Sequence, residues 1–116
     1  MEQSVIILLQ KFLFKMGFTQ VSPDGIAGPK TMAAVQSLPG MNVAWDDKRK
    51  LVAAIQIIAR ENNIPTGNVD GLWGPQTAAA SDALETLLQT GALPKPWRTD
   101  GQGTPAPGNI WPVQNT

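Results

Sequence analysis

The chain has 116 residues, with 9 Lys and Arg against 9 Asp and Glu, and it has no His and no Cys. This length suits one compact domain with a tail. The formal net charge of zero lacks the basic excess typical of nucleic-acid-binding proteins, so we expect no nucleic-acid partner. Without Cys or His, disulfides, the usual zinc ligands and a Ser-His-Asp triad are all excluded. We therefore expect no metal, no cofactor and no catalytic residue of these classes.

We expect no targeting signal in the N-terminal segment. The apolar run at residues 5–9 is too short to span a bilayer, and Glu2 stands where a signal peptide would be basic. We expect synthesis in the cytoplasm without a signal peptide, and no insertion into a membrane.

The first predicted helix covers residues 4–16, with Ser4 as its N-cap and Gly17 at its end. Most of its side chains are apolar, which predicts burial on more than one face. The second and fourth predicted helices begin at Pro29 and Pro75, because proline is favoured at the first position of a helix.

The third predicted helix follows Asp46 or Asp47, either of which can cap it, and runs to about Asn62. Its apolar residues recur at helical spacing, and Asn62 and Asn63 are suited to a left-handed exit. Gly91 closes the fourth helix. The sequence therefore predicts an all-α fold, a small bundle of about four helices.

An internal repeat is the strongest signal in the chain. Residues 24–34 read DGIAGPKTMAA, and residues 70–80, which lie 46 positions later, read DGLWGPQTAAA. The same offset pairs Gln10 with Gln56 without a gap. We interpret the pattern as two copies of one helix–loop–helix unit.

The repeat and a change in composition divide the chain into two parts. The units, at about residues 4–38 and 50–91, form a helical domain over residues 1–93. From residue 94 to residue 116 the chain is rich in Pro and Gly and poor in charge, which predicts a linker or an extended strap.

The repeated D-G-x-x-G-P-x-T pattern describes a compact loop. An Asp side chain accepts hydrogen bonds from the backbone just after it, and Gly25 and Gly71 allow a positive φ. We expect Asp24 and Asp70 to lie near the N-terminus of the following helix, whose free N–H groups stabilise a carboxylate.

A calcium-binding interpretation of these loops fails. If Gly25 held the sixth position of a calcium loop, Gln20 and Thr31 would hold the first and twelfth. In the second copy these positions are Thr66 and Thr77, and none of the four is the carboxylate that calcium requires there.

The two loops resemble the signature of the peptidoglycan-binding domain family, small helical modules attached to bacterial, phage and spore cell-wall hydrolases. The resemblance is carried by PDGIAGPKTMAAVQ at residues 23–36 and VDGLWGPQTAAA at residues 69–80. It covers about residues 4–91 and is specific at the loops. It implies an all-α fold, noncovalent binding of peptidoglycan, and a catalytic domain reached through residues 94–116.

The chain departs from the family pattern in two places. The connection at residues 38–46 is longer than a minimal module needs, and Ala27 stands where the second copy has Trp73. Homologous domains also occur as pro-segments of metalloproteinases, so fold and function are separable.

The candidate binding residues are in the loops and at the helix starts that follow them. In the second copy they are Asn68, Asp70, Gly71, Trp73, Gln76 and Thr77, and in the first Asp24, Gly25, Lys30 and Thr31. Trp73 can stack on a sugar ring, and the alternative is packing against Leu51 or Leu84.

The remaining polar candidates have two interpretations each. Lys30 and Gln76, beside helix N-termini, are placed to meet a stem-peptide carboxylate, or they are ordinary solvated surface. Asn68 and the threonines offer neutral donors and acceptors, and Asp24 and Asp70 either bind ligand hydroxyls or cap their own loops. We expect the second loop to bind better.

Catalysis by this chain alone is not expected. A glycosidase needs two carboxylates facing each other across a cleft. The loops account for Asp24 and Asp70, and Glu61 and Glu85 lie among polar neighbours without a motif of matched roles. Any catalytic activity is then expected in an attached hydrolase domain.

The sequence thus predicts a peptidoglycan-binding module that targets a lytic enzyme, such as a phage endolysin, to the bacterial cell wall. The alternative is a structural or assembly adaptor that reuses the same helical fold. The very apolar first helix favours that alternative, because excess apolar surface marks subunit interfaces, here between two copies of the chain.

Overall fold

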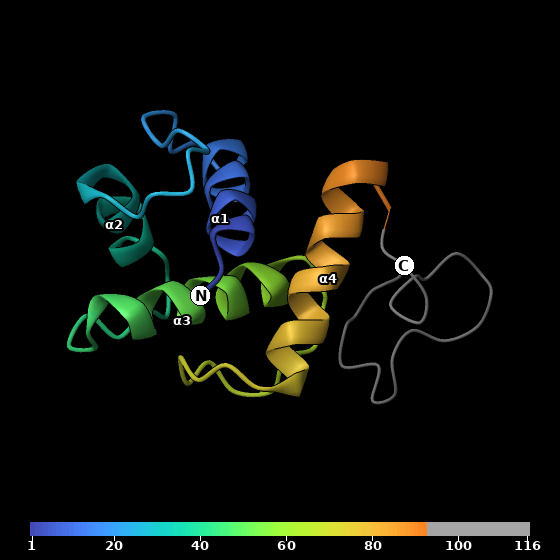
Figure 1. The fold of residues 1–116 in the computed structure, drawn as a ribbon. Helices are drawn as coiled ribbons and strands as arrows, with labels where there is room; N and C mark the ends of the chain where they lie inside the picture. Colours follow the sequence, from blue (N-terminus) through green and yellow to red (C-terminus); the bar gives the residue numbers. More distant parts are fainter. Residues whose placement is uncertain (93–116) are drawn as a thin grey trace.

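The computed structural model describes residues 1–92, which form four helices (Figure 1). They are α1 (Gln3–Lys15), α2 (Pro29–Gln36), α3 (Asp47–Glu61) and α4 (Pro75–Thr90). The described residues contain no strand, and the predicted all-α bundle is confirmed. The predicted linker at residues 94–116 lies outside the described residues.

Helix α3 lies at the centre of the fold. It contacts α1, α2 and α4, whereas α2 and α4 do not contact each other. Figure 1 shows α3 crossing the molecule. Helices α1 and α2 lie on the same side of α3, and α4 crosses near the C-terminal end of α3. Every residue from Lys50 to Ala59 is buried, so the neighbouring helices and loops cover α3 on all sides. The apolar spacing in the sequence predicts only one buried face.

Four of the predicted helix boundaries are confirmed. The side chain of Asp46 accepts a hydrogen bond from Arg49 N at 2.9 Å, which caps α3. Pro29 and Pro75 are the first residues of α2 and α4. Asn63 leaves α3 with a φ of 66°, in the left-handed region where Asn is tolerated.

The predicted N-cap Ser4 is wrong. Helix α1 begins at Gln3, and Glu2 is its extended N-cap residue, whose backbone oxygen accepts from Val5 N and Ile6 N. No side chain caps this helix. The backbone geometry of Glu2 is enough to start the helix one residue earlier.

The hydrophobic core draws on all four helices and on the loop residues Val21, Leu38 and Ile64. Its largest fully buried apolar side chains are Leu9, Leu13, Val35, Ile55, Ile58, Ile64 and Leu84. Helix α1 is not buried all round, because Phe14 is half-exposed near its C-terminus. No helix among residues 1–92 is both long and apolar enough to cross a membrane.

Candidate functional site

Each repeated loop is held by one buried glutamine from the preceding helix of the same unit. In the first unit, Gln10 Oε1 accepts a hydrogen bond from Gly25 N at 2.8 Å. Its Nε2 donates to Asp24 Oδ1 at 3.1 Å, to Ile26 O at 2.9 Å and to Thr31 Oγ1 at 3.1 Å. One side chain therefore joins the turn at Asp24 and Gly25, the backbone of Ile26 and the first turn of α2.

The second unit repeats every hydrogen bond of this network and adds one, from Asp70 N to Gln56 Oε1 at 3.1 Å. Gln56 Oε1 accepts from Gly71 N at 2.9 Å, and Nε2 donates to Asp70 Oδ1 at 3.1 Å. The same nitrogen donates to Leu72 O at 3.2 Å and to Thr77 Oγ1 at 3.0 Å. The repeat in the sequence is thus a repeat of internal hydrogen bonding.

The carboxylates of Asp24 and Asp70 close their own turns. Asp24 Oδ1 accepts from Ile26 N, and Asp70 Oδ1 accepts from Leu72 N, both at 2.9 Å. These backbone hydrogen bonds, and next the glutamine amides, hold the pKa of both carboxyls below the ordinary value of 3.8. Each loop is therefore stabilised by a carboxylate that stays ionised.

The expected stabilisation of these carboxylates by helix N–H groups is not what the structure shows. Gly28 and Gly74 are the N-cap residues of α2 and α4, and neither helix has a side-chain cap. The Asp oxygens bind N–H groups two residues downstream instead, because the turn places those groups closer than the helix start.

Arg49 supports the second loop from outside. Its Nε donates to Asp70 O at 2.8 Å, and its guanidinium lies 4.2 Å from the ring centroid of Trp45. A Cβ atom on Gly71 would meet the backbone oxygen of Arg49 at 2.8 Å, so this close approach requires glycine. In the first unit Gln3 takes the corresponding place against Gly25.

Each loop borders a surface hollow, and the two hollows are equivalent under the repeat. The first has a volume of about 340 Å³ and the second about 490 Å³. The first is lined by Gln20, Ser22, Asp24, Ile26, Gly28, Pro29, Lys30 and Thr31. The residues 46 positions later all line the second hollow, and Gln56, Gly67 and Trp73 line it as well.

The exposed side chains at the edge of the second hollow, which we call its rim, differ more in chemistry than those of the first. Asn68, Trp73 and Gln76 are all exposed there, and Trp73 exposes 45% of its surface. Gln76 reaches across to Gly67, since a Cβ at Gly67 would lie 2.6 Å from Gln76 Oε1. Thr66 also lines this hollow, and its buried hydroxyl has no hydrogen-bond partner among residues 1–92.

The first hollow differs at these same positions. Lys30 replaces Gln76 and is exposed, while Ala27 replaces Trp73 and packs against the core. The first hollow therefore has a cation where the second has an amide, and it lacks the exposed aromatic ring.

The predicted site residues thus divide into two groups. The side chains of Thr31 and Thr77 and the backbones of Gly25 and Gly71 are buried in the glutamine networks. Asp24 and Asp70 take part in the same networks from the surface side. The other group takes no part in the networks and is exposed at the hollows: Lys30, Asn68, Trp73 and Gln76.

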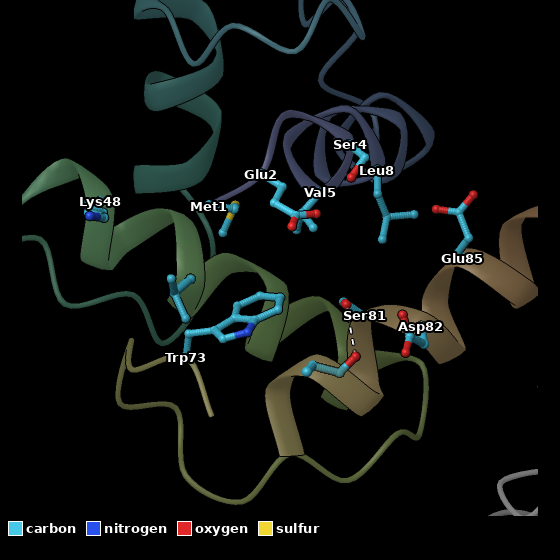
Figure 2. A pocket seen from close by; sticks show the side chains of 12 residues that line it. Met1, Glu2, Ser4, Val5, Leu8, Lys48, Trp73, Ser81, Asp82 and Glu85 are labelled. Carbon is cyan, nitrogen blue, oxygen red and sulfur yellow. Dashed lines mark hydrogen bonds between the residues drawn. The ribbon is translucent and has the colours of Figure 1, made fainter. Parts of the chain in front are cut away.

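A groove of about 690 Å³, larger than either loop hollow, lies between α1 and α4 (Figure 2). The apolar side chains of Val5, Leu8 and Val52 line it. Figure 2 shows Lys48 and Trp73 towards one end, and Asp82 and Glu85 towards the other. Trp73 lines both this groove and the second hollow, so the two are neighbours on one surface.

The roles of Gln10 and Gln56 and the groove itself are missing from the predictions made from the sequence. A signal for the glutamines was present, because a polar residue at the same place in both copies interrupts an apolar helix face. The groove has no such signal, since it is assembled from both units and depends on how α1 and α4 pack.

Comparison with known proteins identifies one family. A family described as a predicted peptidoglycan domain matches residues 4–63, which include α1, the first loop, α2 and α3. No curated protein and no solved structure matches the chain. The match covers more than half of the chain, and it contains Gln10 together with the loop that this residue holds. The chain therefore belongs to the predicted peptidoglycan domain family.

Proposed function

We propose that this chain binds peptidoglycan noncovalently and acts as the targeting module of a cell-wall lytic enzyme, such as a phage endolysin. The observation that carries the proposal is the second hollow, where a rigid loop presents Asn68, Trp73 and Gln76 beside the start of α4. Membership of the family supplies the ligand class.

The chemistry of the second hollow suits a glycopeptide. An exposed indole ring offers an apolar face to a sugar, while Asn68 and Gln76 offer amide donors and acceptors. The partnerless hydroxyl of Thr66 is a further acceptor in the wall, and a bound donor or water would recover its lost hydrogen bond. The glycan part of peptidoglycan, which is rich in amide and hydroxyl groups, matches these groups.

A binding module of this kind works by raising the local concentration of its substrate at a linked active site. Weak binding by one module is then sufficient, because the cell wall is an extended polymer with many repeated sites. In this proposal the chain acts at the bacterial cell wall and leaves catalysis to an attached hydrolase domain.

Sedimentation with purified sacculi tests the proposal. We expect the chain to pellet with the sacculi, and Trp73→Ala to reduce the pelleted fraction without unfolding the protein. Val43→Ala is the matched control, because Val43 is also an exposed apolar residue but lines neither the hollows nor the groove. A wild-type chain that stays in the supernatant would show that the proposal is wrong.

A second candidate function, an assembly adaptor, is favoured by the end of α1. Phe14 exposes 50% of its surface there, and Met16 beside it is also exposed. Light scattering separates the two functions: a stable dimer lost in Phe14→Ser, with no retention by sacculi, would identify an adaptor.

A further inference from the structure

We infer that the groove between α1 and α4 binds the stem peptide of peptidoglycan, with the free side-chain amine of that peptide at Asp82 and Glu85. This inference rests on the proposed function and names a second part of the ligand. The glycan and its amides remain at the neighbouring second hollow.

The size and lining of the groove fit a short peptide. Its volume of about 690 Å³ lies in the range of roughly 300–1,000 Å³ that is typical of small-ligand sites. Val5, Leu8 and Val52 give it apolar walls, and such walls favour the methyl groups of alanine-rich peptides. The side walls come from α1 and α4, which belong to different units.

The charges along the groove are unequal, although the whole chain has a formal net charge of zero. Three carboxylates line it, those of Glu2, Asp82 and Glu85, against two positively charged residues, Lys48 and the N-terminal Met1. Asp82 and Glu85 are one helical turn apart on α4, so both carboxylates lie at the same end (Figure 2). Glu85 accepts a hydrogen bond at 2.8 Å from the side-chain amide of Gln89. Because this amide is neutral, it does not neutralise the charge of the carboxylate.

A stem peptide has a complementary charge. Where it is not cross-linked, it carries a free ammonium group on its diamino acid. An ammonium group at Asp82 and Glu85 would make charge-assisted hydrogen bonds with the carboxylates at this end of the groove. A neutral sugar would gain nothing from these negative charges.

Trp73 connects the groove with the second hollow. Trp73 lines the groove together with Val5 and Val52, and the same residue lines the second hollow. A glycan at that hollow would therefore bring its attached peptide to the Trp73 end of the groove. This continuity favours a peptide that belongs to the same polymer over an unrelated cation.

Titration with a soluble peptide tests the inference directly. The probes are the synthetic peptide Ala-D-isoGln-Lys-D-Ala and the same peptide with its lysine amine acetylated. We expect the free-amine peptide to shift the backbone amide NMR signals of groove residues such as Val5 and Asp82. The acetylated peptide should bind about three- to tenfold more weakly, as the loss of a partly exposed charge-assisted contact predicts. Equal binding of both peptides, or shifts outside the groove alone, would overturn the inference.

Variants and modified sacculi separate this inference from the proposed function. We expect Asp82→Asn/Glu85→Gln to lower retention on sacculi with free amines and to have little effect on N-acetylated sacculi. Glu61→Gln, an exposed carboxylate on α3 that does not line the groove, is the matched control. If the wild type binds both kinds of sacculi equally, the groove inference is wrong and the proposed function stands. If it binds neither, the proposed function itself is wrong. If the double variant fails to fold, the comparison of wild type on the two kinds of sacculi still decides.

Discussion

Gln10 and Gln56, 46 residues apart, make equivalent sets of hydrogen bonds to their two loops. Gln10 Oε1 lies 2.8 Å from Gly25 N, and Gln56 Oε1 lies 2.9 Å from Gly71 N. Both side chains are almost completely buried, and each amide is fully used within its own unit. Two polar side chains inside an apolar core therefore determine the shape of the surface that we propose binds the ligand.

Removing either glutamine should destabilise the whole domain. Gln56→Ala leaves Gly71 N–H and the carboxylate of Asp70 without their buried partner and creates a cavity. We expect a loss of about 3–5 kcal/mol in the free energy of unfolding, measured by urea denaturation. Gln36→Ala, at an exposed position of α2, should change it by no more than about 0.5 kcal/mol. Similar small losses in both variants would contradict the structural role of Gln56.

Acid should weaken the fold through Asp24 and Asp70. Hydrogen bonds in the folded state lower the pKa of both carboxyls from 3.8, so their contribution to stability is present above that value. It is lost as the pH falls below about 4 and through the folded-state pKa. We expect Asp24→Asn/Asp70→Asn to be less stable than the wild type at pH 6, with a smaller difference at pH 3. Parallel stability curves for the two proteins would show that these carboxylates do not drive the acid response.

Two glycines of the second loop should respond differently to the same substitution. Gly71 has a φ of 72°, and a Cβ there would meet Arg49 O at 2.8 Å. Gly74 has an extended φ of −143° and open space around it. We expect Gly71→Ser to cost about 1–3 kcal/mol, and Gly74→Ser, at an N-cap position, to change stability by less than about 0.5 kcal/mol. Thermal denaturation of both variants measures these changes in stability. A larger loss of stability in Gly74→Ser than in Gly71→Ser would contradict the prediction that glycine is required at position 71.

The geometry of the Arg49 side chain, as well as its charge, should stabilise the second loop. Arg49→Lys keeps the positive charge but removes the Nε donor to Asp70 O and the planar group over Trp45. We expect a loss of about 1 kcal/mol and faster amide hydrogen exchange at Gly71 and Leu72. Arg60→Lys, exposed in the last turn of α3, is the control. Unchanged exchange in Arg49→Lys would mean that the second loop does not need this support.

Much of the fold could be predicted from the sequence because its signals are local. Pro29 and Pro75 start helices, Asp46 caps α3 and Asn63 ends it, and each of these effects involves neighbouring residues. Ser4 misled the prediction, since the backbone of Glu2 starts α1 without any side-chain cap.

The candidate site was less predictable because its residues meet across long sequence distances. The repeat located both loops, but it could not separate Thr77, which is buried against Gln56, from the exposed Gln76 beside it. The groove depends on the packing of α1 against α4, and no local pattern encodes that contact.

The anchoring of each loop by its own glutamine has an evolutionary consequence. Since Gln10 and Gln56 fix the backbone, substitutions at rim positions such as Lys30 and Gln76 leave the underlying geometry intact. One copy can therefore change its rim residues while the other keeps its own. Exchange of rim residues between the two copies is therefore expected to alter the surface of the hollows without disturbing the fold.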